Sequence, residues 1–226
     1  MSGEFQFRLF DRERFLGLRP DLVSLSKGEV TARIARLLDE AEAELERAWW
    51  REVLEYRRRG ARDGIEAVRR SVSGGTRVGA RERGPAVQAL LDTLCHVRFE
   101  DGIVQSERTD GTFLELDAER LMWALWQRLP WLEQWAWGFG AWAERGADDF
   151  NWADERAITV MSRVDLERLH ADIERIATEP GAVPEVVADD DAWRTEHRIR
   201  AFVTFRRLVR MAVETPGYSL SLQTPL

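Results

Sequence analysis

The sequence has 226 residues, of which 44% are hydrophobic and 32% are charged, and its formal net charge is −7. This composition indicates a globular chain and excludes an extended disordered protein. The negative charge disfavours indiscriminate nucleic-acid binding by the whole molecule, although it leaves a local basic patch open. The single cysteine, Cys95, excludes an internal disulfide and a four-thiolate zinc site, and it predicts a buried free thiol in a cytoplasmic protein.

No segment has the pattern of an export signal or a membrane span. The N-terminus lacks the basic start and the long apolar core of a signal peptide. The most apolar long stretch, 121–143, is interrupted by charged residues, amides and a proline, so we do not expect it to cross a membrane. The sequence therefore predicts a single soluble domain over residues 1–226.

The first third of the chain predicts a strand followed by helices. Apolar and polar residues alternate over 5–9, which indicates a short strand, and Asp11 is placed to cap a helical turn that extends to Leu16. From Glu29 to Arg59, apolar residues recur at intervals of three and four. This spacing predicts one long amphipathic helix.

Glycine and proline divide the next segment. We expect Gly60 and Gly64 to interrupt the long helix, after which a shorter basic helix leads into a flexible Gly/Arg loop over 73–84. Pro85 is a suitable first residue for a further helix over 86–97.

The second half of the chain predicts helices with a little sheet. Turn-rich sequences within 97–116 indicate a central hairpin, 178–191 form an acidic loop, and 218–222 alternate like an edge strand. Pairing this strand with the N-terminal one gives a small sheet, so the predicted fold is α+β and mainly α-helical. The helices expected in this half cover residues 118–129, 131–144, 164–177 and 192–213.

Tryptophan is concentrated in one region, because seven of the ten tryptophans fall between Trp123 and Trp152. Most of them fit apolar helical stripes, which are typical of a core. Trp123 and Trp137 lie away from those stripes, and an exposed indole is costly unless a partner covers it. Together with Trp152, Asp148 and Asp149, they form the predicted partner-binding surface.

A basic segment extends from 57 to 83, with nine arginines against three acidic residues, a local excess of +6. Its glycines and arginines have the composition of an anion-binding loop, although the Gly-Lys-Ser/Thr element of a nucleotide-binding loop is missing. The other interpretation is a solvated surface loop. The candidate anion-binding residues are Arg57, Arg58, Arg62, Arg77, Arg81 and Arg83.

The last predicted helix combines arginines with a wide apolar face. This combination is typical of a core helix whose arginines pair with neighbouring acids, for which 39–46 supply candidates. The predicted apolar face consists of Trp193, Ile199, Phe202, Val203, Phe205, Leu208, Val209 and Ala212.

Catalytic and metal-binding patterns are weak. His96, His170 and His197 lie on separate predicted helices without a metal-ligand spacing, so we expect no metal and no cofactor. The sequence identifies no catalytic residue. An enzyme whose site forms only in the tertiary structure remains an alternative.

Several segments occur in an order that carries a family resemblance. They are the initial Phe-Arg-Leu, the run Leu114 to Asp117 that opens a helix, 160–176, and a terminal aromatic helix that leads into 218–222. In this order they resemble the YfbM-like family of bacterial proteins, over less than a third of the chain. The resemblance implies a small bacterial α+β domain without an assigned activity, and hence no catalytic residues.

The leading functional hypothesis is a cytoplasmic protein that binds another protein at the tryptophan-rich, acid-flanked surface. An acidic, compact chain of this kind suits an antitoxin-like or immunity-like role against a basic partner. The alternative is binding of nucleic acid or another polyanion through 57–83, which would weaken steeply with salt.

Overall fold

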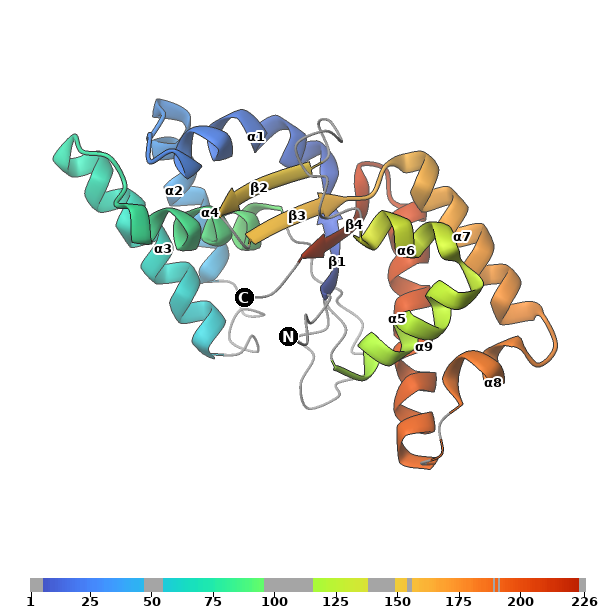
Figure 1. Ribbon diagram of the computed structural model, residues 1–226. Helices are drawn as coiled ribbons and strands as arrows, with labels where there is room; N and C mark the ends of the chain where they lie inside the picture. The colour runs from blue at the N-terminus through green and yellow to red at the C-terminus, as the bar shows by residue number, and fades with distance from the viewer. Residues whose placement is uncertain are drawn as a thin grey trace. The chain divides into compact units, whose positions relative to one another are not determined.

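A computed structural model describes residues 6–46, 55–95, 116–137, 149–153, 156–188, 190 and 192–223. Figure 1 shows the helices and strands of these residues, coloured from the N-terminus in blue to the C-terminus in red. The strands are β1 (Gln6–Asp11), β2 (Asp149–Ala153), β3 (Arg156–Val160) and β4 (Tyr218–Gln223). The helices are α1 (Arg12–Ser26), α2 (Ala32–Leu45), α3 (Glu55–Gly74), α4 (Ala80–Leu94), α5 (Leu116–Arg128), α6 (Pro130–Trp137), α7 (Arg163–Thr178), α8 (Ala182–Val187) and α9 (Ala192–Glu214).

The fold is α+β and mainly α-helical, as predicted. One sheet has the strand order β1-β4-β3-β2, so the N-terminal and C-terminal strands are neighbours, which confirms the predicted pairing. Strands β3 and β4 are antiparallel, with Thr159 opposite Leu222. Just beyond this register, the Met161 amide donates to the carbonyl oxygen of Leu220 at 2.8 Å.

The hairpin of the described sheet was not predicted. Strands β2 and β3 are neighbours in the sheet and are separated by two residues, a connection too short for a parallel crossover. They therefore form an antiparallel hairpin. The hairpin that the sequence predicts within 97–116 lies outside the described residues, apart from its last position.

The contacts between residues divide the chain into two compact units, and each unit is formed by segments that are not continuous in the sequence. Unit 1 contains Met1–Phe10, Val97–Asp149 and Ile158–Leu226, and unit 2 contains Asp11–His96 and Phe150–Ala157. Because the chain enters unit 2 and returns to unit 1, no single linker separates them, and one domain over 1–226 stays a prediction. Among the described helices, none has the length and apolar character that a membrane span needs.

Side-chain caps begin the first two helices of unit 2. The Asp11 carboxylate accepts from the Arg14 amide at 2.8 Å and starts α1, as predicted. Helix α1 then continues to Ser26, well beyond the single turn expected from the sequence. The Thr31 hydroxyl accepts from the Ile34 amide at 3.1 Å and starts α2.

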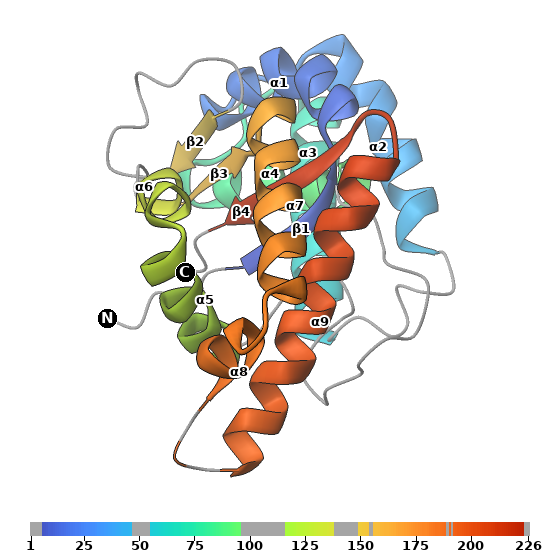
Figure 2. The same ribbon diagram turned by 90° about the vertical axis from the view of Figure 1, so that its right-hand side faces the viewer.

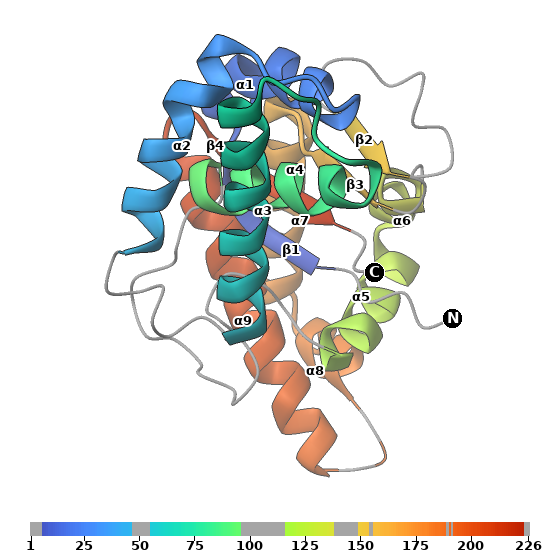
Figure 3. The same cartoon turned by 90° about the vertical axis from the view of Figure 1, so that its left-hand side faces the viewer.

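The prediction of one helix from Glu29 to Arg59 is wrong. Helix α2 ends at Leu45, and α3 covers Glu55–Gly74 and packs against α2. Figure 3 shows the two helices as neighbours in unit 2. Apolar residues at intervals of three and four describe one long helix and two packed helices equally well, so only tertiary contacts distinguish these arrangements.

Gly60 and Gly64 lie inside α3 and do not interrupt it, which corrects the sequence prediction. A Cβ at Gly64 would stand 2.5 Å from the carbonyl oxygen of Pro85 and 2.9 Å from the Cβ of Ala89, both on α4. Gly64 therefore lets two helices cross closely (Figure 3). Because α3 ends at Gly74 and α4 begins at Ala80, the loop predicted over 73–84 is shorter than expected.

Unit 1 has a core formed by α5, α6, α7, α8, α9 and strand residues, in which α7 and α9 lie side by side (Figure 2). Its helices α7 and α9 match their predicted ranges within one residue. The acidic loop expected over 178–191 is partly wrong, because Ala182–Val187 form α8, which packs on α5, α7 and α9. Gly181 precedes this helix with a φ of 82°.

The predicted apolar face of α9 is only partly buried. Trp193, Ile199 and Val203 are exposed, because the core of unit 1 covers a narrower stripe than the sequence offers. The residues of α9 that the core buries are Phe202, Phe205, Leu208, Val209 and Ala212.

Candidate functional site

Part of the tryptophan cluster belongs to the core of unit 1. Trp126 on α5 is 1% exposed and lies in the core between Leu125 and Leu129 along the chain, as the helical stripe predicts. Trp131 on α6 is half-buried, and its indole N–H donates to the Asp172 carboxylate of α7 at 2.9 Å. The guanidinium carbon of Arg168 stands 4.4 Å from the centroid of the same indole.

Trp123 is the predicted contact residue that the structure places at the surface. Its side chain is 46% exposed, although it lies on the same helix as the fully buried Trp126. The two rings meet edge to face, with centroids 5.1 Å apart and an angle of 69° between their planes. The buried ring thus supports an indole that presents much of its surface to solvent.

The side chains of the other predicted contact residues lie outside what the structure describes, so their position relative to Trp123 is not tested. Trp137 is the last residue of α6, and Trp152 and Asp149 lie in β2, but only their backbone is described. Asp148 lies outside the described residues. These four residues therefore keep the status of sequence predictions.

Several arginines of the predicted anion-binding segment already contact oxygen atoms of the protein. Arg62 donates to Glu46 at 3.1 Å, Arg77 stands 3.5 Å from Glu29, and Arg83 donates to the carbonyl oxygen of Val78 at 3.2 Å. Their charge is thus partly compensated inside unit 2.

Arg57 and Arg58 also belong to that segment and lie in α3, where only their backbone is described. Arg81 at the start of α4 is exposed and forms no ion pair with another described residue.

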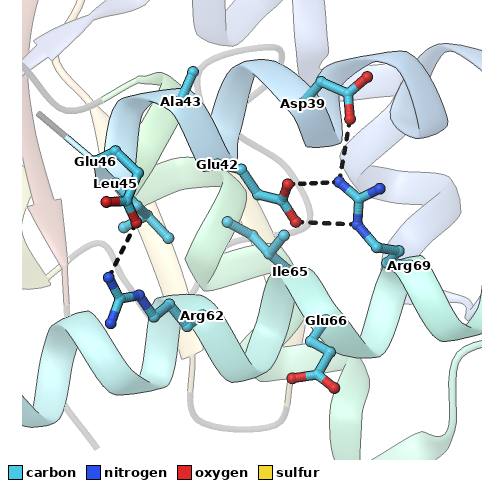
Figure 4. A pocket seen from close by; sticks show the side chains of 9 residues that line it. All are labelled: Asp39, Glu42, Ala43, Leu45, Glu46, Arg62, Ile65, Glu66 and Arg69. Carbon is cyan, nitrogen blue, oxygen red and sulfur yellow. Dashed lines mark hydrogen bonds and ion pairs between the residues drawn. The ribbon is translucent and has the colours of Figure 1, made fainter.

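A groove of about 690 Å³ lies between α2 and α3, and sequence reasoning did not find it. Figure 4 shows charged side chains from both helices around it. Leu45 and Ile65 line it and are 4% and 2% exposed, respectively. Its charged lining has four carboxylates and two guanidinium groups, from Asp39, Glu42, Glu46, Glu66, Arg62 and Arg69.

Ion pairs across the groove hold α2 against α3. Arg69 donates to Glu42 at 3.0 Å and to Asp39 at 3.1 Å (Figure 4). These hydrogen bonds raise the pKa of Arg69 above its ordinary value. The sequence predicted that the acids of 39–46 pair with the arginines of α9. In the described ion pairs, these acids instead pair with arginines of unit 2. Arg206 of α9 instead donates to Glu174 of α7 at 2.9 Å.

No protein-family model, curated protein or solved structure matches the chain. The resemblance to the YfbM-like family therefore stays a prediction. Function has to be argued from the residues themselves.

The described residues offer little for catalysis. Among them, no group of three or more His, Cys, Asp and Glu side chains is arranged to hold a metal ion. Cys95 is a buried free thiol, as predicted, and burial raises its pKa, so the reactive thiolate is disfavoured. His170 stands 4.0 Å from Glu174 on the same helix, α7. The surfaces with chemical character are therefore the exposed indole, the α2–α3 groove and the basic helix α9.

Proposed function

We propose that this protein is a cytoplasmic binding protein that acts by contact with another protein, through a surface centred on Trp123. The observation that carries the proposal is the 46% exposure of this indole above the buried Trp126. Large aromatic side chains dominate the energy of protein interfaces, and they are costly to leave in water. The predicted contacts of Trp137, Trp152, Asp148 and Asp149 belong to the same proposal.

A basic partner fits this proposal best. The chain has a net charge of −7, and two predicted contact residues are acidic. Such complementarity raises association rates and excludes partners of the same charge. An acidic chain of this kind would suit an antitoxin-like or immunity-like role against a basic partner.

The test compares two exposed apolar side chains of unit 1. The immobilised protein captures partners from extracts of its source cells, and the affinity of each purified partner is then measured by calorimetry. We expect Trp123→Ala to weaken the affinity at least about tenfold, as for a central aromatic contact. The matched control is Val164→Ala on α7, which shortens an apolar side chain that is 76% exposed and lies outside both proposed surfaces. Equal affinities for both variants would contradict the proposal.

The polyanion alternative is tested by titrating labelled RNA and DNA at low and moderate salt. An arginine that is already paired must give up its carboxylate before it binds phosphate, and Arg62 and Arg77 are in this situation. The proposal therefore predicts no salt-sensitive binding. Micromolar binding that disappears when Arg77, Arg81 and Arg83 are changed to alanine would replace the proposal with the alternative.

A further inference from the structure

Helix α9 leaves large apolar side chains at the surface, on the side that faces away from the core of unit 1. Ile199 and Val203 are one turn apart and are 42% and 49% exposed, and Trp193 is 58% exposed. These three are half of the large apolar side chains that are exposed among the described residues. Exposed apolar groups that gather on one face are typical of interaction surfaces.

The same helix is strongly basic within an acidic protein. From 194 to 210 it contains six arginines and one glutamate, whereas the whole chain has a net charge of −7. Arg200 and Arg207 lie three residues before and four residues after Val203, so they flank the apolar residues on the helix surface.

Two acids offset part of this charge. Glu196 pairs with Arg200, and Glu174 of α7 pairs with Arg206 and stands 3.6 Å from Arg210. The six arginines outnumber these two carboxylates, and Arg198 and Arg207 have further interaction partners within the protein.

We propose that the outer face of α9, defined by Trp193, Ile199, Val203, Arg200 and Arg207, is a docking surface for an acidic amphipathic helix of a partner protein. Leucines at intervals of three and four on such a helix would cover the apolar side chains. Its carboxylates would compete with Glu196 for Arg200, and a guanidinium group can bind a carboxylate through two parallel hydrogen bonds. A nucleic-acid backbone matches the charge but offers no aliphatic stripe for Ile199 and Val203.

This inference goes beyond the proposed function, because it concerns a different helix of unit 1 and a partner segment of the opposite charge. It does not depend on Trp123. The two ideas therefore fail separately: Trp123→Ala should leave docking on α9 unchanged.

The first experiment uses two labelled synthetic peptides and fluorescence anisotropy at low salt with the full chain. One peptide is an amphipathic helix of leucine and glutamate, and the other has glutamine in place of every leucine. We expect the leucine peptide to bind at least about tenfold more tightly, because only this peptide covers the apolar stripe. Absence of binding, or equal affinity for both peptides, would overturn the inference.

Matched variants locate the binding. The pair Ile199→Gln and Val203→Gln should weaken the leucine peptide about tenfold, whereas Val164→Gln on α7, at 76% exposure, should change it less than twofold. All three positions are exposed, so the variants should fold, which circular dichroism checks. Equal effects of the α9 pair and the α7 control would place the peptide elsewhere and overturn the inference.

Charge and the class of partner are tested separately. Arg200→Gln should weaken the leucine peptide more than Arg175→Gln, because both arginines are half-exposed but only Arg200 lies beside the apolar stripe. Sedimentation with vesicles that contain phosphatidylserine tests a membrane surface. Vesicle binding without peptide binding would overturn the docking of a protein helix in favour of an anionic membrane.

Discussion

Two glycines on α3 provide the sharpest test of the arrangement of unit 2. Gly60 is exposed, and a Cβ there would meet nothing within 4 Å. Alanine favours a helix over glycine by about 1 kcal/mol, so Gly60→Ala should raise the free energy of unfolding by roughly 0.5–1 kcal/mol. The same substitution at Gly64 gains the same helix propensity but must also fit against α4.

The space at Gly64 determines the sign of its effect. The new Cβ would stand 2.5 Å from the carbonyl oxygen of Pro85, which belongs to the backbone and cannot rotate away, and 2.9 Å from Ala89. Overpacking of this kind costs roughly 1–3 kcal/mol, and the upper half of that range applies when a helix has to move. After the gain in propensity is subtracted, Gly64→Ala should lower the free energy of unfolding by about 1–2 kcal/mol.

Urea denaturation followed by circular dichroism measures both variants against the parent chain. The midpoints should move in opposite directions, and the slopes should stay equal because the substitution does not change the surface that unfolding exposes. The difference between the variants should be about 2–3 kcal/mol. If Gly64→Ala were as stable as Gly60→Ala, α3 and α4 would not cross where the structure places them.

Three further predictions concern individual side chains. Trp126→Ala should lower the free energy of unfolding by about 3–5 kcal/mol, and Trp123→Ala should lower it by less than about 1 kcal/mol. Urea denaturation measures both variants. Similar losses of stability would contradict the different burial of the two side chains. Cys95 should react with a thiol reagent only after unfolding, because burial raises the pKa of its thiol, and rapid reaction of the folded protein would contradict this. The hydrogen bond from Arg206 holds the pKa of Glu174 below its ordinary value. The stability that the Glu174 carboxylate provides is therefore fully present above its unfolded-state pKa. This stability is lost as the pH falls through the lower folded-state pKa. The difference in unfolding free energy between the parent and Glu174→Gln should therefore shrink in acid, and a constant difference from neutral pH into acid would refute it.

Local signals in the sequence predict much of the fold. The cap at Asp11, the proline that opens α6 and the alternation at the C-terminal strand are read within a few residues, and the structure contains each of them. Exposure of Trp123 is also a local property, because residues on one helix face recur at three and four positions.

Features that depend on distant residues were not predictable. The acidic partner of Arg206 is Glu174, which lies 32 residues away, and the sequence alone gives no reason to prefer it over the acids of 39–46. From the sequence alone, Gly64 is expected to interrupt a helix, as glycine often does. Only the close contact with α4 shows why a glycine lies inside α3 at this position. Both cases need the tertiary structure, since helix periodicity contains no information about which surfaces meet.

The width of an apolar helix face is informative for the same reason. A helix beside a core buries a stripe about as wide as its neighbours can cover, whereas the predicted apolar face of α9 has eight residues over a broader arc. The core of unit 1 takes five of them and leaves Trp193, Ile199 and Val203 outside. Solvent contact of these side chains costs free energy that neither the core nor helix propensity recovers. A partner that covers them would recover it, and the arginines beside them favour an acidic partner.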